Sequence, residues 1–385
     1  MSAAATNATV KAAEAPPPVM LSQLKCWCFG TGGGAAAVSS ADFALPDYPL
    51  LRAIAYRFDP AKYWMFQADY RCAAMQELPQ RLAMERLAGI FDSAGVRFAP
   101  IKGADVAVNY YPDPALRIRC DLDVLVHPDD IETAERLALA DNWRRIAVYE
   151  HGYHRPVLTR QNVNLELHFN LPQIGGEHIA YLWEQLEPVP GYSTRRRLPP
   201  ELTALLVFHH ARHHQWLTGV VALADLGFML GKLKKLDWAR IDELAAHFGI
   251  AAPEAFFHAF AGFFPAWSMP AGAPPPEDIL RGIRTAVHAH LNIHDRRELV
   301  MGLGRRFSLE WWRERGKGFR PSVVRYTYHL PPKGHFFRLC GGYLRMIRDK
   351  AMLTFRALSN RDSGDASALE AVNRVETYLS GLERK

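Results

Sequence analysis

Two aspartates separated by one residue, Asp121 and Asp123, are the side chains in this sequence best spaced to bind a metal ion. They lie in residues 117–126, where polar and apolar residues alternate, as in a strand with one buried and one open face. Residues two apart on a strand project from the same side, about 6.6–6.8 Å apart at Cα, so both carboxylates can converge on one cation. Mg²⁺ prefers carboxylate oxygens and often bridges them to substrate phosphates. The spacing therefore predicts a metal site suited to phosphoryl or nucleotidyl transfer.

A third carboxylate and a basic turn are predicted to lie beside this pair. Glu166 is on the polar face of an expected strand at 163–170, which could pair with the first strand. Lys102 and Gly103 stand where an expected strand turns into a helix, and the free backbone N–H groups at a helix start bind phosphate. These features indicate one charged cleft built from separate parts of the chain.

Arg117 and Arg119 share the alternating segment with the two aspartates. A guanidinium group can clamp phosphate through two parallel hydrogen bonds, so both arginines are candidates for nucleotide binding. The alternative, of equal weight, is that they only neutralise the aspartates by ion pairing on a solvated face. For an isolated pair of aspartates this plain explanation would be preferred. The neighbouring Glu166 and Lys102 are what favour a functional site.

Several histidines are candidates for the wall of the cleft. His168 shares a strand face with Glu166, where it could polarise an acceptor or serve as a hydrogen-bonded structural residue. Farther on, four histidines form two pairs at the i,i+4 spacing of zinc ligands: His209, His210, His213 and His214. The two pairs point about 100° apart on a helix and enclose no glutamate, so lining of the cleft, by His209 and His213, or packing is favoured over metal binding. Asp225 is expected to be a buried partner of one of these histidines or of an arginine.

The elements that must position these residues follow from the hydrophobic pattern. Helical spacing over 74–94 ends at Gly95, and a strand, a short helix, the alternating strand, another helix and a hairpin follow. The expected ranges are 96–101, 104–111, 117–126, 127–143 and 153–172. This order predicts an α/β (α+β) unit with a small mixed sheet, and the helical pattern of 199–288 predicts a helical region after it.

The composition of the 385-residue chain is that of a globular protein, with 49% hydrophobic and 22% charged residues. We expect a flexible N-terminal extension (1–50), a catalytic core (51–198), a helical substrate or acceptor domain (199–300) and a basic C-terminal segment (301–385). Residues 301–361 hold 11 Arg and 3 Lys against 2 Glu and 1 Asp, so this segment could attract an anionic partner.

Two features bear on location. The most apolar stretch, 254–272, is interrupted by Pro265 and is too short to span a membrane, so no transmembrane segment is expected. The five cysteines are scattered and odd in number, and the N-terminus lacks the pattern of a secretory signal, which together favour a reduced, cytoplasmic location.

The stretches IKGADVAVNYYPDPALRIRCDLDVLV and VNLELHFNLP resemble a bacterial nucleotidyltransferase family of the polymerase-beta-like superfamily, whose members read LKG, Arg, DxDxLV and then xExH. The similarity covers about residues 75–310, including the His-rich helix. It implies a polymerase-beta-like core followed by a helical domain, with Asp121, Asp123 and Glu166 as catalytic residues and ligands of Mg²⁺ or Mn²⁺, and a turn at Gly103 that holds the triphosphate.

The sequence departs from the wider superfamily at this turn. Gly103 is followed by Ala104, which offers no hydroxyl to a phosphate, and Lys102 could supply charge instead. Sixteen residues separate Ala104 from Asp121, which is longer than usual.

The expected activity is transfer of a nucleoside monophosphate from an NTP, with ATP as the expected donor, to a hydroxyl or phosphate of a small molecule, saccharide or peptide. Two alternatives stay open. One is a non-catalytic nucleotide-binding or regulatory protein on the same fold, and the other is phosphoryl transfer from the same cleft.

Overall fold

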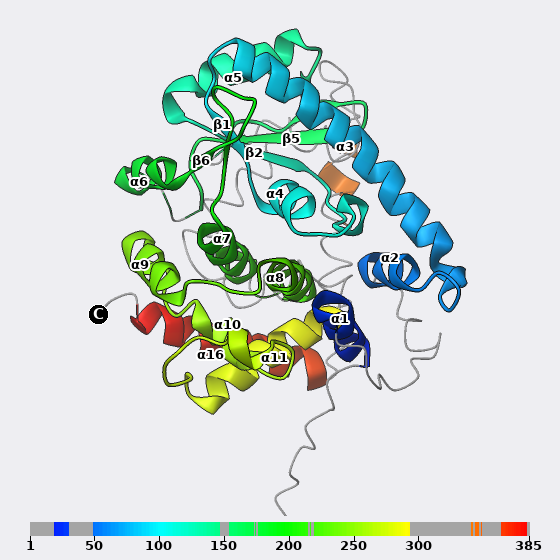
Figure 1. Ribbon diagram of the computed structural model, residues 1–385, viewed down its shortest axis with the longest axis vertical. Coiled ribbons are helices and arrows are strands. Elements are labelled where there is room, and N and C mark those ends of the chain that lie inside the picture. Colours follow the sequence, from blue (N-terminus) through cyan, green and yellow to red (C-terminus); the bar gives the residue numbers. More distant parts are fainter. Residues whose placement is uncertain are drawn as a thin grey trace, which may run out of the picture.

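The computed structural model describes residues 19–30, 49–146, 154–172, 174, 176–214, 216, 219–292, 340, 341, 343–345, 348 and 363–382. Within these ranges a small mixed sheet lies at one end of the molecule and a bundle of helices at the other (Figure 1). The basic stretch 301–361 lies almost wholly outside the described residues, so the structure does not test its expected role.

The sheet has the strand order β1-β2-β5-β4-β3, with β2 and β5 parallel and the other neighbours antiparallel. The strands are β1 (Phe98–Pro100), β2 (Leu122–Val126), β3 (Arg144–Arg145), β4 (Leu158–Arg160) and β5 (Val163–His168). The predicted hairpin is present: β4 and β5 are joined at Gln161 and Asn162, whose φ angles of 49° and 65° suit a tight hairpin turn. A separate two-stranded sheet pairs β6 (Glu187–Pro188) with β7 (Arg196–Arg197).

Helices cover both faces of the larger sheet. One face packs on α3 (Gln67–Ser93) and α5 (Ile131–Ala140), through a core that takes Leu122, Val124 and Val126 from β2. The other face carries Asp123 and Leu125 and lies toward α4 (Lys102–Asn109), followed by α7 (Pro200–His213) and α8 (Gly219–Leu233) (Figure 1). The mixed α/β unit followed by a helical region is thereby confirmed.

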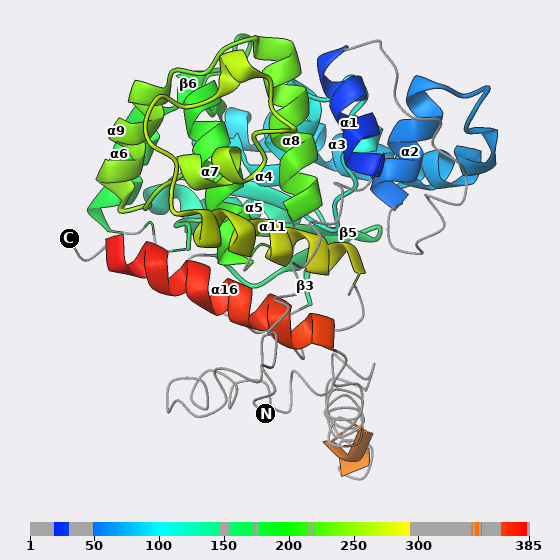
Figure 2. The same ribbon diagram turned by 90° about the horizontal axis from the view of Figure 1, so that it is seen from below.

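The remaining helices lie below the sheet, except for α6, which lies beside the strands next to β6 (Figure 1). They are α1 (Val19–Phe29), α2 (Pro49–Phe58), α6 (Glu177–Gln185), α9 (Trp238–Phe248), α10 (Glu254–Ala259), α11 (Glu277–Asn292) and α16 (Ser363–Leu382). In Figure 2, α16 runs alongside α11, although some 70 residues separate them in the chain. Val372, Val375 and Leu379 of α16 are buried in the main core, so this end of the chain is part of the bundle.

Residues 19–29, which we expected within a flexible extension, form the buried helix α1. Leu21, Leu24 and Cys28 recur at helical spacing and are buried against α8. Two glycines of α8 allow the close approach: a Cβ on Gly231 would lie 2.0 Å from the Cys28 carbonyl oxygen, and one on Gly227 2.7 Å from the Cys28 Sγ. The low periodicity of the surrounding residues hid this single short helix.

The strand expected at 117–126 is shorter than its alternating pattern indicates. Only residues 122–126 form β2, and Pro114–Leu116 form a single turn of 3₁₀ helix before it. The pairing of β2 with β5 begins at Leu122 opposite Leu165, so Arg117 and Arg119 lie before the paired segment. Their side chains therefore do not form a row with the aspartates.

A buried acid joins the core to the helical region. Asp105 of α4 is 2% exposed, and its carboxyl group accepts hydrogen bonds from Asn109 Nδ2 at 2.7 Å and from Thr203 Oγ1 of α7 at 3.3 Å. Burial raises the pKa of Asp105 to about 7, although both hydrogen bonds oppose the shift.

We expect Asp105→Asn to change how stability depends on pH. Unfolded Asp105 ionises near pH 4, whereas folded Asp105 holds its proton to about pH 7, so the wild type loses stability as pH rises between these values. The variant should gain about 2–4 kcal/mol over the wild type between pH 4 and pH 8 in urea unfolding. Asp129→Asn, at a site 76% exposed, is the control. A difference between variant and wild type that stays constant with pH would contradict the prediction.

Candidate active site

Asp123, the second residue of β2, is the centre of a polar cluster on the sheet face that points toward α4. Its carboxylate is 5% exposed, and Oδ1 accepts hydrogen bonds from Lys102 Nζ at 2.7 Å and from His168 Nε2 at 2.8 Å. Burial opposes the charge of Asp123, but the Lys102 ammonium and His168 hold the pKa of its carboxyl group well below the usual range. Asp123 is thus an anion enclosed by protein, and not a side chain on a solvated face as the sequence indicated.

Glu166 and His168 reach Asp123 because β2 and β5 are parallel and in register. Asp123 is paired with Glu166, and Leu125 with His168, which places all three polar side chains on one face. His168 Nε2 lies 3.4 Å from Glu166 Oε2 as well as 2.8 Å from Asp123. Burial opposes the charge of His168, yet these two carboxylates raise its pKa. The His168 imidazole therefore lies between the two carboxylates and contacts both of them.

Asp121 directly precedes β2 and lies near enough to Asp123 and Glu166 for their charges to act on it. It is partly buried, and burial together with the charges of Asp123 and Glu166 raises its pKa to about 6. Three neighbouring acids repel one another unless cations compensate, and Lys102 and His168 supply part of that compensation.

The donor set fits a divalent cation. Asp123, Glu166 and His168 each offer a ligand atom, and these atoms lie within 4.8 Å of one another, whereas Asp121, a ligand expected from the sequence, does not belong to this group. Carboxylate oxygens suit Mg²⁺ and Mn²⁺, and a cation would relieve the repulsion that raises the pKa of Asp121. Lys102 holds the same Asp123 oxygen through its ammonium group, so the position next to Asp123 already favours positive charge.

Lys102 and Gly103 form a tight turn into α4, as the sequence predicted. Lys102 has a φ of 51°, which is uncommon for a residue with a side chain. A Cβ on Gly103 would lie 3.4 Å from Cζ of Arg117 and 3.5 Å from Cβ of Arg119. These are ordinary van der Waals distances, so the start of α4 packs directly against the arginine segment without requiring glycine at this position.

Arg117 turns away from the aspartates and binds Asp225 of α8. Its Nε donates to Asp225 Oδ1 at 2.7 Å, and Tyr111 Oη donates to the same oxygen at 2.7 Å. Burial disfavours the charged guanidinium, but Asp225 raises the pKa of Arg117. The expectation that Asp225 is a buried partner of an arginine or a histidine is confirmed, and Arg117 is fixed in a structural ion pair.

Arg119 is held by the inner face of α3. Its Nη2 lies 3.3 Å from Glu77 Oε1, and its carbonyl oxygen accepts a hydrogen bond from Gln80 Nε2 at 3.0 Å. Neither α3 residue was singled out from the sequence. The sequence feature that could have identified them is their position, because Glu77 and Gln80 are polar residues on the helix face that otherwise carries the apolar residues Ala73, Met84 and Leu87.

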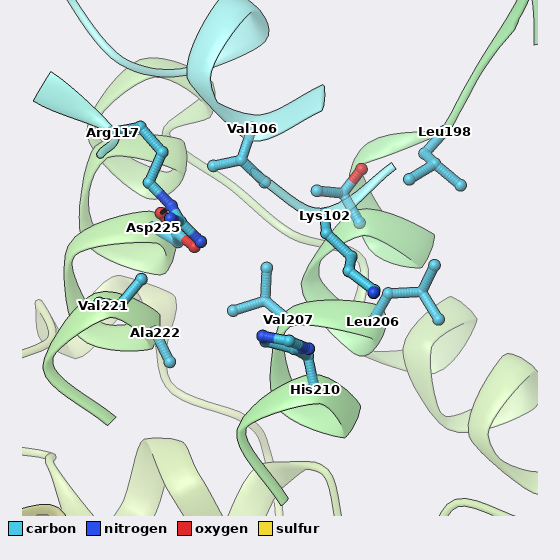
Figure 3. A pocket seen from close by; sticks show the side chains of 11 residues that line it. Lys102, Val106, Arg117, Leu198, Leu206, Val207, His210, Val221, Ala222 and Asp225 are labelled. Carbon is cyan, nitrogen blue, oxygen red and sulfur yellow. Dashed lines mark hydrogen bonds and ion pairs between the residues drawn. The ribbon is translucent and has the colours of Figure 1, made fainter. Parts of the chain in front are cut away.

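A small cavity adjoins the cluster between α4, α7 and α8. Its volume of about 20 Å³ is enough for one water, and Lys102 lines it together with His210 and Thr203 of α7 (Figure 3). Figure 3 places the Arg117–Asp225 pair on one side of this cavity and Lys102 with His210 on the other. Lys102 therefore belongs to both the carboxylate cluster and the cavity.

His210, and not His209 or His213, is the α7 histidine at this cavity. His209 Nε2 lies 2.8 Å from the Pro172 carbonyl oxygen, and His213 is exposed at the end of α7. Burial, with lesser contributions from His214 and Lys102, lowers the pKa of His210 to about 2, so it is neutral. The sequence feature that could have identified His210 is its spacing from Thr203, Leu206 and Val207, which places all four residues on one helix face.

Comparison with known proteins agrees with this geometry. A family described as uncharacterised nucleotidyltransferase matches residues 52–262, more than half of the chain, and this range contains the sheet, α7 and α8. No curated protein matches the chain. Within the described ranges, no helix combines the length and apolarity needed to cross a bilayer. Asp121, Asp123 and Glu166 all lie inside the matched range, and the chain belongs to this nucleotidyltransferase family.

Proposed function

We propose that this nucleotidyltransferase is metal-dependent and transfers a nucleoside monophosphate from an NTP, with ATP as the donor, to a hydroxyl or phosphate of an acceptor. The observation that carries the proposal is the pairing of Asp123 with Glu166 on one sheet face, with Asp121 directly before β2 and Lys102 as a cationic neighbour. The acceptor is a small molecule, saccharide or peptide.

The five cysteines are free thiols, which supports a reducing, cytoplasmic setting.

The residues of the cluster have separate tasks in this proposal. Asp121, Asp123 and Glu166 would hold Mg²⁺ or Mn²⁺, which stabilises the attacking and leaving oxygens of phosphoryl chemistry when bound. His168 keeps Asp123 and Glu166 in position through its Nε2. Lys102 donates to anionic oxygen, at Asp123 in the free protein and at the triphosphate in the complex. Glu166, 22% exposed at its side chain, would either share in holding the cation or accept the proton of the attacking hydroxyl.

One observation favours a second candidate, a non-catalytic nucleotide-binding protein on the same fold. Lys102 and His168 already satisfy Asp123, so this carboxylate has structural partners without a metal. The two candidates differ in turnover: incubation with α-labelled NTPs, Mn²⁺ and host lysate should transfer label to an acceptor only in the first. An acceptor that gains phosphate alone, detected by its mass, would instead indicate phosphoryl transfer.

We expect Asp121→Asn and Asp123→Asn each to lower label transfer by about 10³-fold or more, because each removes negative charge that holds the cation. Asp123→Asn should also destabilise the fold, since Lys102 and His168 lose a buried counter-charge. Asp129→Asn is the control for both and should retain normal transfer. Full activity in both active-site variants would contradict the metal assignment.

Lys102→Ala should raise the KM for NTP more than it lowers kcat, because its ammonium holds phosphate in both the ground and the transition state. Without nucleotide, the same variant should bind Mn²⁺ more tightly than the wild type, since a competing cation has left Asp123. Mn²⁺ titration by electron paramagnetic resonance measures this directly. Lys235→Ala, at an exposed site, should change neither quantity. Unchanged KM and Mn²⁺ affinity in Lys102→Ala would show that the ammonium has neither role.

Glu166→Gln should still bind Mn²⁺ and NTP, because Asp121 and Asp123 remain, while single-turnover transfer falls by about 10²–10⁴-fold as expected for a lost general base. Nucleotide affinity and the transfer rate should be measured on the same preparation. A rate near that of the wild type would remove Glu166 from the chemistry and favour the non-catalytic candidate.

A further inference from the structure

The outward face of α3 carries an apolar stripe that the nucleotidyltransferase site does not use. Met75, Leu78 and Leu82 are 75%, 46% and 54% exposed, and their spacing of three and four residues places them on one side of the helix. Figure 1 shows α3 along the edge of the molecule, with no other labelled element beyond it. Large apolar residues that share one helix face in water mark an interaction surface.

The stripe is separate from the face by which α3 packs on its own chain. Ala73, Glu77, Gln80, Met84 and Leu87 form the buried face, and they alternate along the helix with the exposed stripe. With 27 residues the helix is about 40 Å long, so its outer face offers several turns to a partner. The spacing from Met75 to Leu82 is one heptad with Leu78 between, which is the pattern of a seam between two helices.

Opposite charges flank the stripe and indicate which partner it fits. Exposed Arg71 lies one turn before Met75, and exposed Glu85, which also lies 3.8 Å from Arg81 of its own helix, lies about one turn after Leu82. If two copies of α3 run antiparallel about Leu78, Met75 of each lies near Leu82 of the other, and Arg71 of each lies near Glu85 of the other. A parallel pair would instead place arginine beside arginine and glutamate beside glutamate, which is unfavourable.

We propose that the protein forms a homodimer through antiparallel packing of the α3 stripe, residues 71–85, against the same stripe of a second copy. The surface is self-complementary in both apolar pattern and charge, as a two-fold interface requires. Because Glu77 and Gln80 on the inner face of α3 hold Arg119, the dimer also stabilises the helix that supports the arginine segment beside the active site.

The first test is the molecular mass of the full chain in solution. At about 50 μM protein, well above the Kd of a micromolar complex, light scattering should give twice the 43.4 kDa chain mass. Leu78→Lys with Leu82→Lys should give the monomer mass while the chain keeps its folded circular dichroism spectrum, because both side chains are exposed in the single chain. Gln76→Lys, exposed on the same helix beside the stripe, should remain dimeric. A monomeric wild type, or a dimer that persists in the double variant, would overturn the proposal.

The second test addresses the antiparallel arrangement. Arg71→Glu alone and Glu85→Arg alone should each weaken the dimer, by about threefold or more in Kd per like-charge contact. The double charge reversal should restore it. These two positions are fourteen residues apart on one helix, so they cannot compensate each other within a chain, and rescue requires contact between copies. Weakening by the single changes without rescue by the double reversal would overturn the antiparallel arrangement.

Discussion

A carboxylate that is removed from water must be paired with positive charge, and Asp123 imposes this requirement on the architecture around it. Its Oδ1 holds Lys102 from the turn into α4 and His168 from the end of β5, so three separate segments meet at one atom. The uncommon backbone conformation of Lys102 and the parallel register of β2 with β5 both serve this meeting. The cluster thus combines structural pairing with an excess of negative charge suited to a cation.

Much of this site could be predicted from the sequence because its signals are local. The period-two pattern around Asp123 and Glu166 and the Lys102-Gly103 turn each depend on a few adjacent residues. The alternating pattern also predicted too long a strand, because Arg117 and Arg119 alternate with apolar residues although they lie outside any strand. Their partners are Asp225, which lies 108 residues from Arg117, and Glu77, which lies 42 residues from Arg119, and no local rule can identify such pairs.

Contacts between distant parts of the chain also determine which histidine lines the cavity and whether residues 19–29 and 363–382 join the folded body. His209, His210 and His213 have the same side chain, and only the packing of α7 against α4 and α8 decides that His210 lines the cavity. Residues 19–29 and 363–382 have modest apolar patterns and gain their burial from α8 and α11, which are distant in sequence. Tertiary contacts, and not local propensity, determine which segments belong to the folded body.

The buried pair of Arg117 and Asp225 has a mechanical consequence. It connects the segment just before β2 to the middle of α8, and Tyr111 donates to the same carboxylate oxygen. A motion that swung α8 away from the sheet would have to separate this buried ion pair, so the pair opposes such a motion. The pair therefore couples the position of α8 to that of the segment before β2, the segment that also carries Arg119 and leads into Asp121 and Asp123.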